Sequence, residues 1–131
     1  MYHLDLKNIS KKGGLKMAND IKRGDVFMAS IETAKSVHVQ KNIRPVVVIQ
    51  NDKGNYFSPT LIVCPITSAN KPKQVTHVYL DNIKFLNNKS IILCEQILTI
   101  DKTSLIKFLG HLDNISMKYL DNRIKISLQL D

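Results

Sequence analysis

The chain contains no long hydrophobic run. No apolar stretch approaches the roughly 20 residues that a membrane-spanning helix needs. The first residues, Met1–Asp5, have neither the charged region nor the apolar region of a signal peptide. We therefore expect a cytoplasmic protein without a membrane partner.

Cysteine is scarce, with two residues in a chain of 131. Cys64 and Cys94 each lie within an apolar run, which favours buried free thiols over a disulfide or a metal pair. The histidines form no cluster with carboxylates at the spacing of metal ligands. We expect neither a metal nor another cofactor.

Acidic residues are also few. Eleven aspartates and glutamates face 19 lysines and arginines, which leaves a net charge of +8. This balance favours a polyanionic partner such as RNA, DNA or an acidic protein. A chain of this length forms one domain with a single modest core.

Residues 1–16 differ from the rest of the chain, with four lysines, one aspartate and little periodicity. The stretch Lys11–Met17 reads as a bacterial ribosome-binding site and start codon translated in frame. We expect residues 1–16 to be a disordered extension or a translated ribosome-binding region, with the native domain over 17–131. The alternative is a genuine basic arm that contacts a partner.

Apolar runs predict a small antiparallel β domain with appended helices. The predicted strands cover residues 24–31, 46–49, 61–66, 75–80 and 90–94. We expect a long polar connection over 32–43, and an edge or bulge at Pro65, which lacks a ladder donor. The predicted helices are 102–109, capped by Asp101, and one that begins after Asp113-Asn114.

Arg44 and Thr67 form a candidate pair. The runs 46–49 and 61–66 flank a block rich in Asn, Asp, Gly, Ser and Pro, which predicts two strands joined by a turn-rich loop. Antiparallel pairing about a loop centre near residues 55 and 56 places Arg44 opposite Thr67. A guanidinium beside a hydroxyl suits a phosphate site. A solvated strand-end arginine and an ordinary strand threonine are the alternative.

Eight short motifs follow one another along the chain. They are Lys22–Val26, Arg44–Asp52, Ser58–Thr60, Ile66–Ser68, Thr76–Val78, Glu95–Ile97, Thr99–Asp101 and Ile126–Leu128. In this order and spacing they resemble the MazF/PemK family of type II toxin–antitoxin endoribonucleases over about residues 20–130. The resemblance implies an SH3-like small antiparallel barrel of the MazF/PemK/CcdB type with a C-terminal helix.

The same resemblance implies a homodimeric toxin that binds single-stranded RNA. It implies sequence-specific, metal-independent cleavage of mRNA, inhibited by a cognate antitoxin whose acidic, disordered C-terminal segment folds onto the toxin. The family's catalytic arginine of the Arg-Pro motif and threonine of the Ile-Thr-Ser motif fall on Arg44 and Thr67.

The chemistry available to this pair is attack by the RNA 2′-OH, which leaves a 2′,3′-cyclic phosphate and a 5′-OH. Because an arginine pKa lies above about 12, Arg44 is a poor base, and we assign it to stabilising charge on the phosphorane. Proton transfer to the leaving 5′-oxygen is its second possible role. Thr67 then binds a phosphate oxygen or orients the 2′-OH.

Further polar residues are candidates for RNA contact. They are Lys41, Gln50, Asn51, Asn55, Tyr56, Ser68, Glu95 and Gln96. Amides can read base edges and a tyrosine can stack on a base. Turn capping explains the asparagines equally well, and a structural pair explains Glu95 and Gln96. His38 is a proton shuttle or an exposed loop residue, while His77 and His111 are expected to be structural.

The sequence departs from the family pattern in two places. The stretch 36–43 has no glycine before the Arg-Pro, where the family usually has glycines, and Leu98 stands where the family often has arginine. The cut-site sequence is therefore left open. Two other functions remain: a non-enzymatic toxin that binds gyrase through the C-terminal helix, and a weakened member that binds only RNA or antitoxin. Arg44 with Thr67 favours the enzyme.

Overall fold

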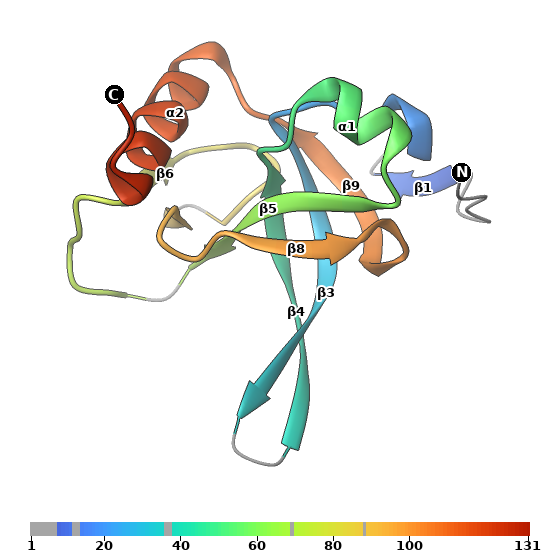
Figure 1. Cartoon of the computed structure of the whole chain (residues 1–131), viewed down its shortest axis with the longest axis horizontal. Helices are drawn as coiled ribbons and strands as arrows, with labels where there is room; N and C mark the ends of the chain where they lie inside the picture. The colour runs from blue at the N-terminus through green and yellow to red at the C-terminus, as the bar shows by residue number, and fades with distance from the viewer. Residues whose placement is uncertain (1–7, 12–13, 36–37, 69, 88) are drawn as a thin grey trace.

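The computed structural model describes residues 8–11, 14–35, 38–68, 70–87 and 89–131. This part of the chain is mainly strand, with one long helix near the C-terminus (Figure 1). The strands are β1 Asn8–Lys11, β2 Gly14–Met17, β3 Asp25–Lys35, β4 His38–Val48, β5 Thr60–Thr67, β6 His77–Asp81, β7 Lys89–Leu93, β8 Leu98–Asp101 and β9 Leu105–His111. The helices are α1 Asp52–Phe57 and α2 Asn114–Leu128, with 3-10 turns η1 Ala18–Asp20 and η2 Lys102–Ser104.

The strands form one sheet in the order β2-β1-β9-β3-β4-β5-β7-β6, with β8 paired to β5 beside this path. Neighbours are antiparallel except β1 and β9, which run parallel. The predicted fold class, a small antiparallel β domain with a C-terminal helix, is confirmed. In the described part of the chain, neither α-helix is long and apolar enough to cross a membrane.

The predicted hairpin register is confirmed where β4 meets β5. Val46 pairs with Pro65, Val47 with Cys64 and Val48 with Val63. Pro65 is not on a sheet edge. On the side of β5 away from β4, residues 60–63 pair with β8 and residues 66–67 pair with β7. Pro65 lies between these two pairings. A residue without an N–H fits this gap between two ladders.

The end of strand β4 at residues 46–48 is buried on both faces, as its continuous apolar run predicts. Val46 and Val48 pack in one core cluster with Phe27 and Leu61, while Val47 packs in a second cluster with other residues. The second cluster contains Cys64, Ile66, Ile92 and Leu120 among its buried members. The two cores therefore lie on opposite sides of β4.

The two cysteines are buried free thiols, as predicted. A hydrogen bond between the side chains of Cys64 and Cys94, followed by burial, raises the pKa of the Cys64 thiol. Cys64 is therefore protonated and acts as a small apolar side chain of the core.

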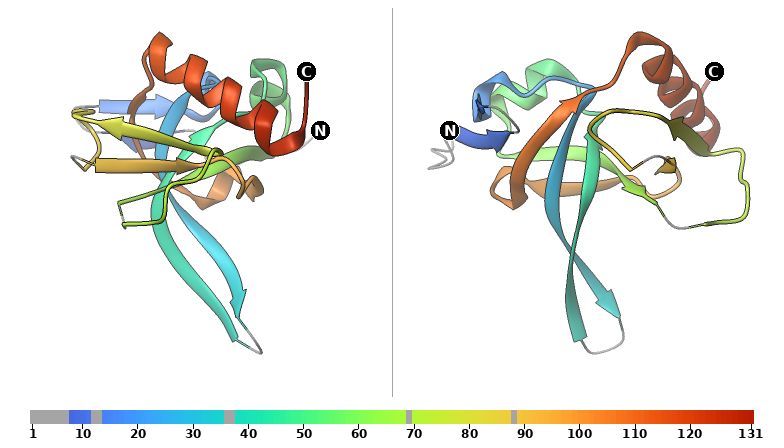
Figure 2. Two further views of the ribbon diagram at one scale, coloured as in Figure 1. Left: turned by 90° about the vertical axis from the view of Figure 1, so that its left-hand side faces the viewer. Right: turned by 180° about the vertical axis from the view of Figure 1, so that it is seen from behind.

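The predicted polar connection over 32–43 is wrong. β3 and β4 continue past the body of the domain as a two-stranded arm, in which Glu32 pairs with Lys41 and Lys35 with His38. All views show this ribbon projecting away from the other strands (Figures 1 and 2). A ribbon that leaves the domain has no core to face, so its sequence lacks the apolar alternation that marks a strand.

The predicted turn-rich loop over 50–60 contains a short helix, α1. Asn51 accepts a hydrogen bond from the Gly54 N–H at 2.8 Å and so caps its first turn. Asn, Asp and Gly are typical of turns and of helix caps alike, so composition could not separate the two.

The predicted helix over 102–109 is also wrong. Only Lys102–Ser104 form a 3-10 turn, Asp101 makes no side-chain cap bond, and Leu105–His111 form strand β9. β9 pairs with β3, with Lys107 opposite Met28. Pairing along β3 outweighs the weak helical preference of the segment. Strand β8 was not predicted.

The second predicted helix is confirmed as α2, capped by Asp113, which accepts from the Ser116 N–H at 2.7 Å.

The expected disorder of residues 1–16 differs from the structure where it is described. Asn8–Lys11 and Gly14–Met17 form a hairpin, and β1 lies beside β9 with Ser10 opposite Lys107. Residues 1–7 and 12–13 lie outside the described part of the chain. A native start at Met17 stays a prediction.

Candidate functional site

A cavity of about 660 Å³ opens where the β3–β4 arm leaves the body of the domain. Its size falls in the range of about 300–1,000 Å³ that is usual for small-ligand sites. It is lined by Met28, Asn42, Ile43, Arg44, Pro45, Ile66, Thr67, Ser68, Lys84, Phe85, Leu86, Asn87, Ser90, Lys107 and Leu109. These residues come from β3, β4, β5, β7, β9, the β6–β7 loop and, for Ser68, the start of the β5–β6 connection.

Arg44 and Thr67 both line this cavity. They lie two residues beyond Val46 and Pro65, the last pair that the β4–β5 ladder contains. Both residues are half-buried. Pro45 follows Arg44 and keeps it in extended backbone at the start of the buried run. The predicted pair is thus brought to one site by strand pairing.

Three cations line the cavity: Arg44, Lys84 and Lys107. No aspartate or glutamate stands among the described lining residues, although the whole chain contains 11 acidic residues. Like charges gathered in a partly enclosed space repel each other and attract a counter-ion. The charge of the described lining therefore favours an anionic ligand.

The β6–β7 loop forms one wall of the cavity and is held by its own hydrogen bonds. It begins at Asn82, which has a left-handed backbone with φ of 59°, a conformation that asparagine tolerates. The Leu86 N–H donates to the Ile83 carbonyl at 3.0 Å, and the Ser90 hydroxyl donates to the Asn87 carbonyl at 3.1 Å. These two hydrogen bonds tie the described residues of the loop to one another and to β7.

Phe85 fixes the same loop to strand β9. Its ring lies directly over Gly110, where a β-carbon would stand 2.5 Å from Cε2 and closer still to Cδ2. Only glycine leaves room for this contact, because real β-carbons do not approach other atoms so closely. The contact sets the distance between the loop that carries Lys84 and the strand that carries Lys107.

The structure separates the predicted RNA contacts into two groups. Ser68 lines the cavity beside Thr67. Gln50, Asn51, Asn55, Tyr56, Glu95 and Gln96 are not among the described lining residues. The Lys41 side chain, like that of His38, lies outside the described part of the structure.

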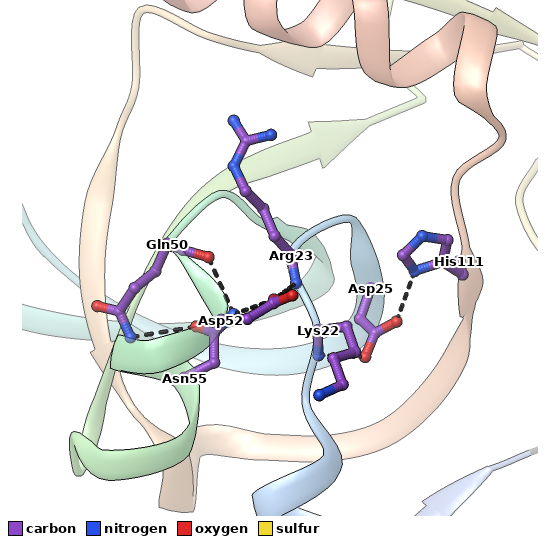
Figure 3. A network of polar contacts seen from close by, with 7 residues as sticks. All are labelled: Lys22, Arg23, Asp25, Gln50, Asp52, Asn55 and His111. Atoms are coloured by element: carbon purple, nitrogen blue, oxygen red, sulfur yellow. Dashed lines mark hydrogen bonds and ion pairs between the residues drawn. The ribbon is translucent and has the colours of Figure 1, made fainter.

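Gln50 and Asn55 form an internal support for α1 (Figure 3). The Gln50 amide donates to Asn55 Oδ1 at 3.1 Å and to the Thr60 carbonyl at 3.0 Å, while the Asn55 amide donates to the Gln50 carbonyl at 2.9 Å. Asn55 is fully buried. Its amide is satisfied within the protein and out of reach of an RNA base, which corrects the predicted contact.

Tyr56 is 54% exposed and stacks edge-on against exposed Phe57, with the ring centroids 4.7 Å apart.

Glu95 contacts Thr76 and buried His77: the Thr76 hydroxyl donates at 3.0 Å, and His77 Nε2 lies 3.3 Å from Oε2. Burial raises the pKa of Glu95, but hydrogen bonds from its own backbone, Thr76 and His77 outweigh this and lower it overall. Glu95 fits the structural alternative.

A second polar network lies around Arg23, away from the cavity (Figure 3). The Arg23 N–H donates to Asp52 Oδ1 at 2.6 Å and its Nε donates to the Ile49 carbonyl at 2.8 Å. Arg23 Nη2 lies 2.7 Å from Asp121 Oδ1 on α2. That oxygen accepts no well-directed hydrogen bond, so the contact is an ion pair set by distance. Arg23 thus ties α1 and α2 to the sheet.

His111 belongs to a structural pair as well. Its Nδ1 lies 2.8 Å from Oδ1 of buried Asp25, whose other oxygen accepts from the Lys22 N–H at 2.8 Å (Figure 3). His77 is buried beneath Glu95 and packs against Tyr79. Among the described residues no group of three or more His, Cys, Asp or Glu could hold a metal ion.

Sequence reasoning missed Asn42, Lys84, Phe85, Asn87 and Lys107 as cavity residues. The helix expected over 102–109 hid Lys107, because a strand there would have paired with residues 25–29 and placed Lys107 beside Met28. Lys84 had a weaker signal, its position between two predicted strands. No local pattern separates a lysine on a cavity wall from one on an open loop.

Comparison with known proteins gives a consistent family. The family model described as PemK-like, MazF-like toxin of type II toxin-antitoxin system matches residues 22–128. An Endoribonuclease MazF of Staphylococcus saprophyticus is 46% identical over 112 residues, covering 84% of this chain and 92% of that protein. An Endoribonuclease MazF of Staphylococcus epidermidis is 45% identical over 113 residues, covering 85% and 93%.

Solved structures share the fold. An endoribonuclease from a mycobacterial species superposes with a TM-score of 0.69 at 17% identity, covering 88% of this chain and 97% of that one. A MazE-MazF structure from Deinococcus radiodurans gives a TM-score of 0.69 at 18% identity, covering 85% and 97%. At such identities the likeness concerns the fold alone.

The fold and the site define a small antiparallel β domain with a cavity at the end of a strand pair, whose described lining is cationic. Within that class, the chain belongs to the PemK-like, MazF-like family of type II toxin–antitoxin toxins.

Proposed function

We propose that this protein is an endoribonuclease that cleaves single-stranded RNA, mRNA in particular, at specific sequences without a metal ion. It acts in the cytoplasm as the toxin of a type II toxin–antitoxin pair. The observation that carries the proposal is the placement of Arg44 and Thr67 on one cavity whose described lining has three cations and no carboxylate. Relatives at 45% and 46% identity that are named Endoribonuclease MazF support the activity.

The reaction uses the nucleophile that RNA already carries. The 2′-OH gives its proton to solvent water and attacks the adjacent phosphorus. The bond from phosphorus to the 5′-oxygen breaks, and this oxygen takes up a proton, so that the products end in a 2′,3′-cyclic phosphate and a 5′-OH. Alignment and charge stabilisation are what the protein must supply. A half-buried arginine and a threonine at one strand end suit both tasks.

Arg44 stabilises the charge that develops on the phosphorane oxygens. Its guanidinium offers a fork of donors that matches two phosphate oxygens. Since the cavity adds Lys84 and Lys107 nearby, the potential at the phosphate is strongly positive. A second role for Arg44 is to give a proton to the leaving 5′-oxygen. Thr67 donates to a phosphate oxygen or orients the 2′-OH.

The RNA path begins at the cavity. Ser68, beside Thr67 and exposed, is placed to contact the strand next to the scissile phosphate. Exposed Tyr56 and Gln96 remain candidates for bases further along, as do Lys41 and the Asn51 region. Asn55 is left out because it is fully buried.

Two protein partners complete the proposal. The cognate antitoxin binds through an acidic segment, which complements a net charge of +8. Solved structures of an endoribonuclease with its cognate antitoxin and of MazE-MazF share this fold. The toxin itself forms a homodimer, which light scattering after size exclusion tests directly.

The experiment is cleavage of a long single-stranded RNA by the purified chain in EDTA, beside Arg44→Ala and Thr67→Ala. We expect the wild type to cut at defined sites and each variant to lose about two to three orders of magnitude in rate. Lys118→Ala on α2 is the matched control for loss of one cation outside the cavity.

RNA left intact by the wild type over a broad range of sequences would remove the enzymatic reading. The test for a gyrase-binding toxin is then whether purified gyrase is inhibited. Normal cutting by both alanine variants would leave the activity in place and show that the site is wrongly assigned.

A further inference from the structure

The cavity holds more positive charge than one phosphoryl transfer requires. A single scissile phosphate is matched by the fork of Arg44 and the hydroxyl of Thr67. Lys84 and Lys107 line the same space from the β6–β7 loop and from β9.

The geometry of the cavity spreads these cations over different walls. Arg44 belongs to β4, Lys107 to β9 on the far side of β3, and Lys84 to a loop that joins two strands beyond β5. A nucleic acid strand carries a phosphate at every nucleotide, so it can pair with several separated cations at once, which a single small anion cannot do. Apolar Met28, Ile43, Phe85 and Leu109 between them supply surface for a base or a ribose.

The wall that carries Lys84 is supported by three contacts within the protein. The Phe85 ring packs against Gly110, the Ser90 hydroxyl donates to the Asn87 carbonyl, and the Leu86 N–H donates to the Ile83 carbonyl. The backbone next to Lys84 is therefore held by contacts within the protein. A site prepared in this way gains affinity, because less ordering is needed when the strand binds.

We infer that the cavity holds the nucleotide next to the scissile phosphate, and that Lys84 and Lys107 bind the phosphates that flank this nucleotide. The inference rests on the proposed endoribonuclease function and extends it. The two lysines are binding and positioning residues, whereas Arg44 and Thr67 act on the reacting phosphate. The enzyme then requires RNA longer than a dinucleotide for full affinity.

The test uses Lys84→Gln and Lys107→Gln, singly and together, in the full-length chain. Glutamine keeps most of the side-chain length, so packing by the lysine stem is retained. The probe is a single-stranded RNA that spans a cut site mapped with the wild type, compared with a dinucleotide that carries only the scissile phosphate. We measure kcat and KM separately over a range of salt concentrations.

We expect each single variant to raise KM for the longer RNA roughly tenfold, with kcat little changed. The slope of log KM against log salt should fall by about 0.7 for each phosphate that a lysine no longer neutralises. On the dinucleotide, the double variant should raise KM much less than it does on the longer RNA. Lys84→Arg and Lys107→Arg should restore most of the affinity.

The control is Lys118→Gln, which removes the same charge from an exposed position on α2 outside the cavity lining. If this control raises KM as much as the cavity variants do, net charge explains the effect and the inference is overturned. It is also overturned if the cavity variants keep the wild-type KM and salt slope while the enzyme still cuts.

Failure of the proposed function has a different signature, since the wild type would then cut no RNA. Binding of a fluorescein-labelled, random-sequence single-stranded RNA would decide the inference in that case. Weaker binding by Lys84→Gln and Lys107→Gln than by Lys118→Gln supports a strand in the cavity. Equal binding by all three overturns it.

Discussion

Gly110 lies so close to the ring of Phe85 that a β-carbon at residue 110 would stand 2.5 Å from Cε2. This contact joins strand β9 to the β6–β7 loop, and both carry lysines of the cavity. The shape of the candidate site therefore depends on one missing methyl group.

The first prediction concerns that methyl group. Gly110→Ala should lower the free energy of unfolding by about 1–3 kcal/mol, because the ring or the strand must move. It should also raise KM for RNA, since Lys84 moves with the loop. Urea unfolding and steady-state cleavage measure the two effects.

A double-mutant cycle isolates the contact. Phe85→Leu in the Gly110→Ala background should recover part of the lost stability, because a smaller side chain makes room for the new methyl group. Strictly additive effects of the two substitutions would show that residues 85 and 110 do not act through each other.

The second prediction separates charge from geometry at residue 44. Arg44→Lys keeps the positive charge but replaces a planar fork by a point charge. We expect kcat to fall by roughly 100-fold or more, with a smaller change in KM. A lysine variant that cuts at the wild-type rate would mean that only the charge matters.

The third prediction concerns Lys102, which is 3% exposed and donates to the Asn55 carbonyl of α1 at 2.5 Å. Desolvation by burial lowers the pKa of Lys102 from its ordinary value of 10.5. The unfolded chain then binds more protons than the folded chain, so stability rises with pH between the lowered pKa and 10.5.

Lys102→Met should remove this rise. The difference in the free energy of unfolding between the wild type and Lys102→Met should move in favour of the wild type as pH approaches 10.5. Lys118→Met, at an exposed position, should run parallel to the wild type. A constant difference for Lys102→Met across this range would contradict the account.

The fourth prediction concerns the loss at low pH of the stability that Glu95 contributes. The hydrogen bonds that lower its pKa favour the charged carboxylate in the folded state. Their contribution is complete above the ordinary value of 4.5 and is lost as pH falls through the lowered pKa. The stability advantage of the wild type over Glu95→Gln should therefore shrink below pH 4.5, as chemical unfolding at several pH values can measure.

Much of the core could be predicted from sequence. The continuous run at 46–49 and its partner run at 61–66 are buried strands, and the turn-rich block between them was enough to predict their register. Arg44 and Thr67 each lie two residues beyond the end of that ladder, and both line the cavity. Local patterns work here because the two strands are neighbours in sequence and in the sheet.

The remainder depends on contacts that sequence does not mark. β9 is a strand because β3 offers it a ladder, although Leu105, Ile106 and Leu109 also fit a helix face. The arm extends away from the body of the domain (Figure 1), and its sequence has no apolar alternation. Gln50 and Asn55 satisfy each other across α1, whereas their residue types equally suggest contact with bases. Lys84 and Lys107 are far apart in sequence, and only the tertiary structure brings both to the wall of one cavity.

The most direct test of the central claim is cleavage of an RNA in which the nucleotide before the mapped cut carries a single 2′-deoxy sugar. We predict that the all-RNA substrate yields 2′,3′-cyclic phosphate and 5′-OH ends in EDTA, and that the substituted RNA is not cut at that position. Continued cleavage of the 2′-deoxy substrate at the same bond, with 5′-phosphate ends, would contradict the claim.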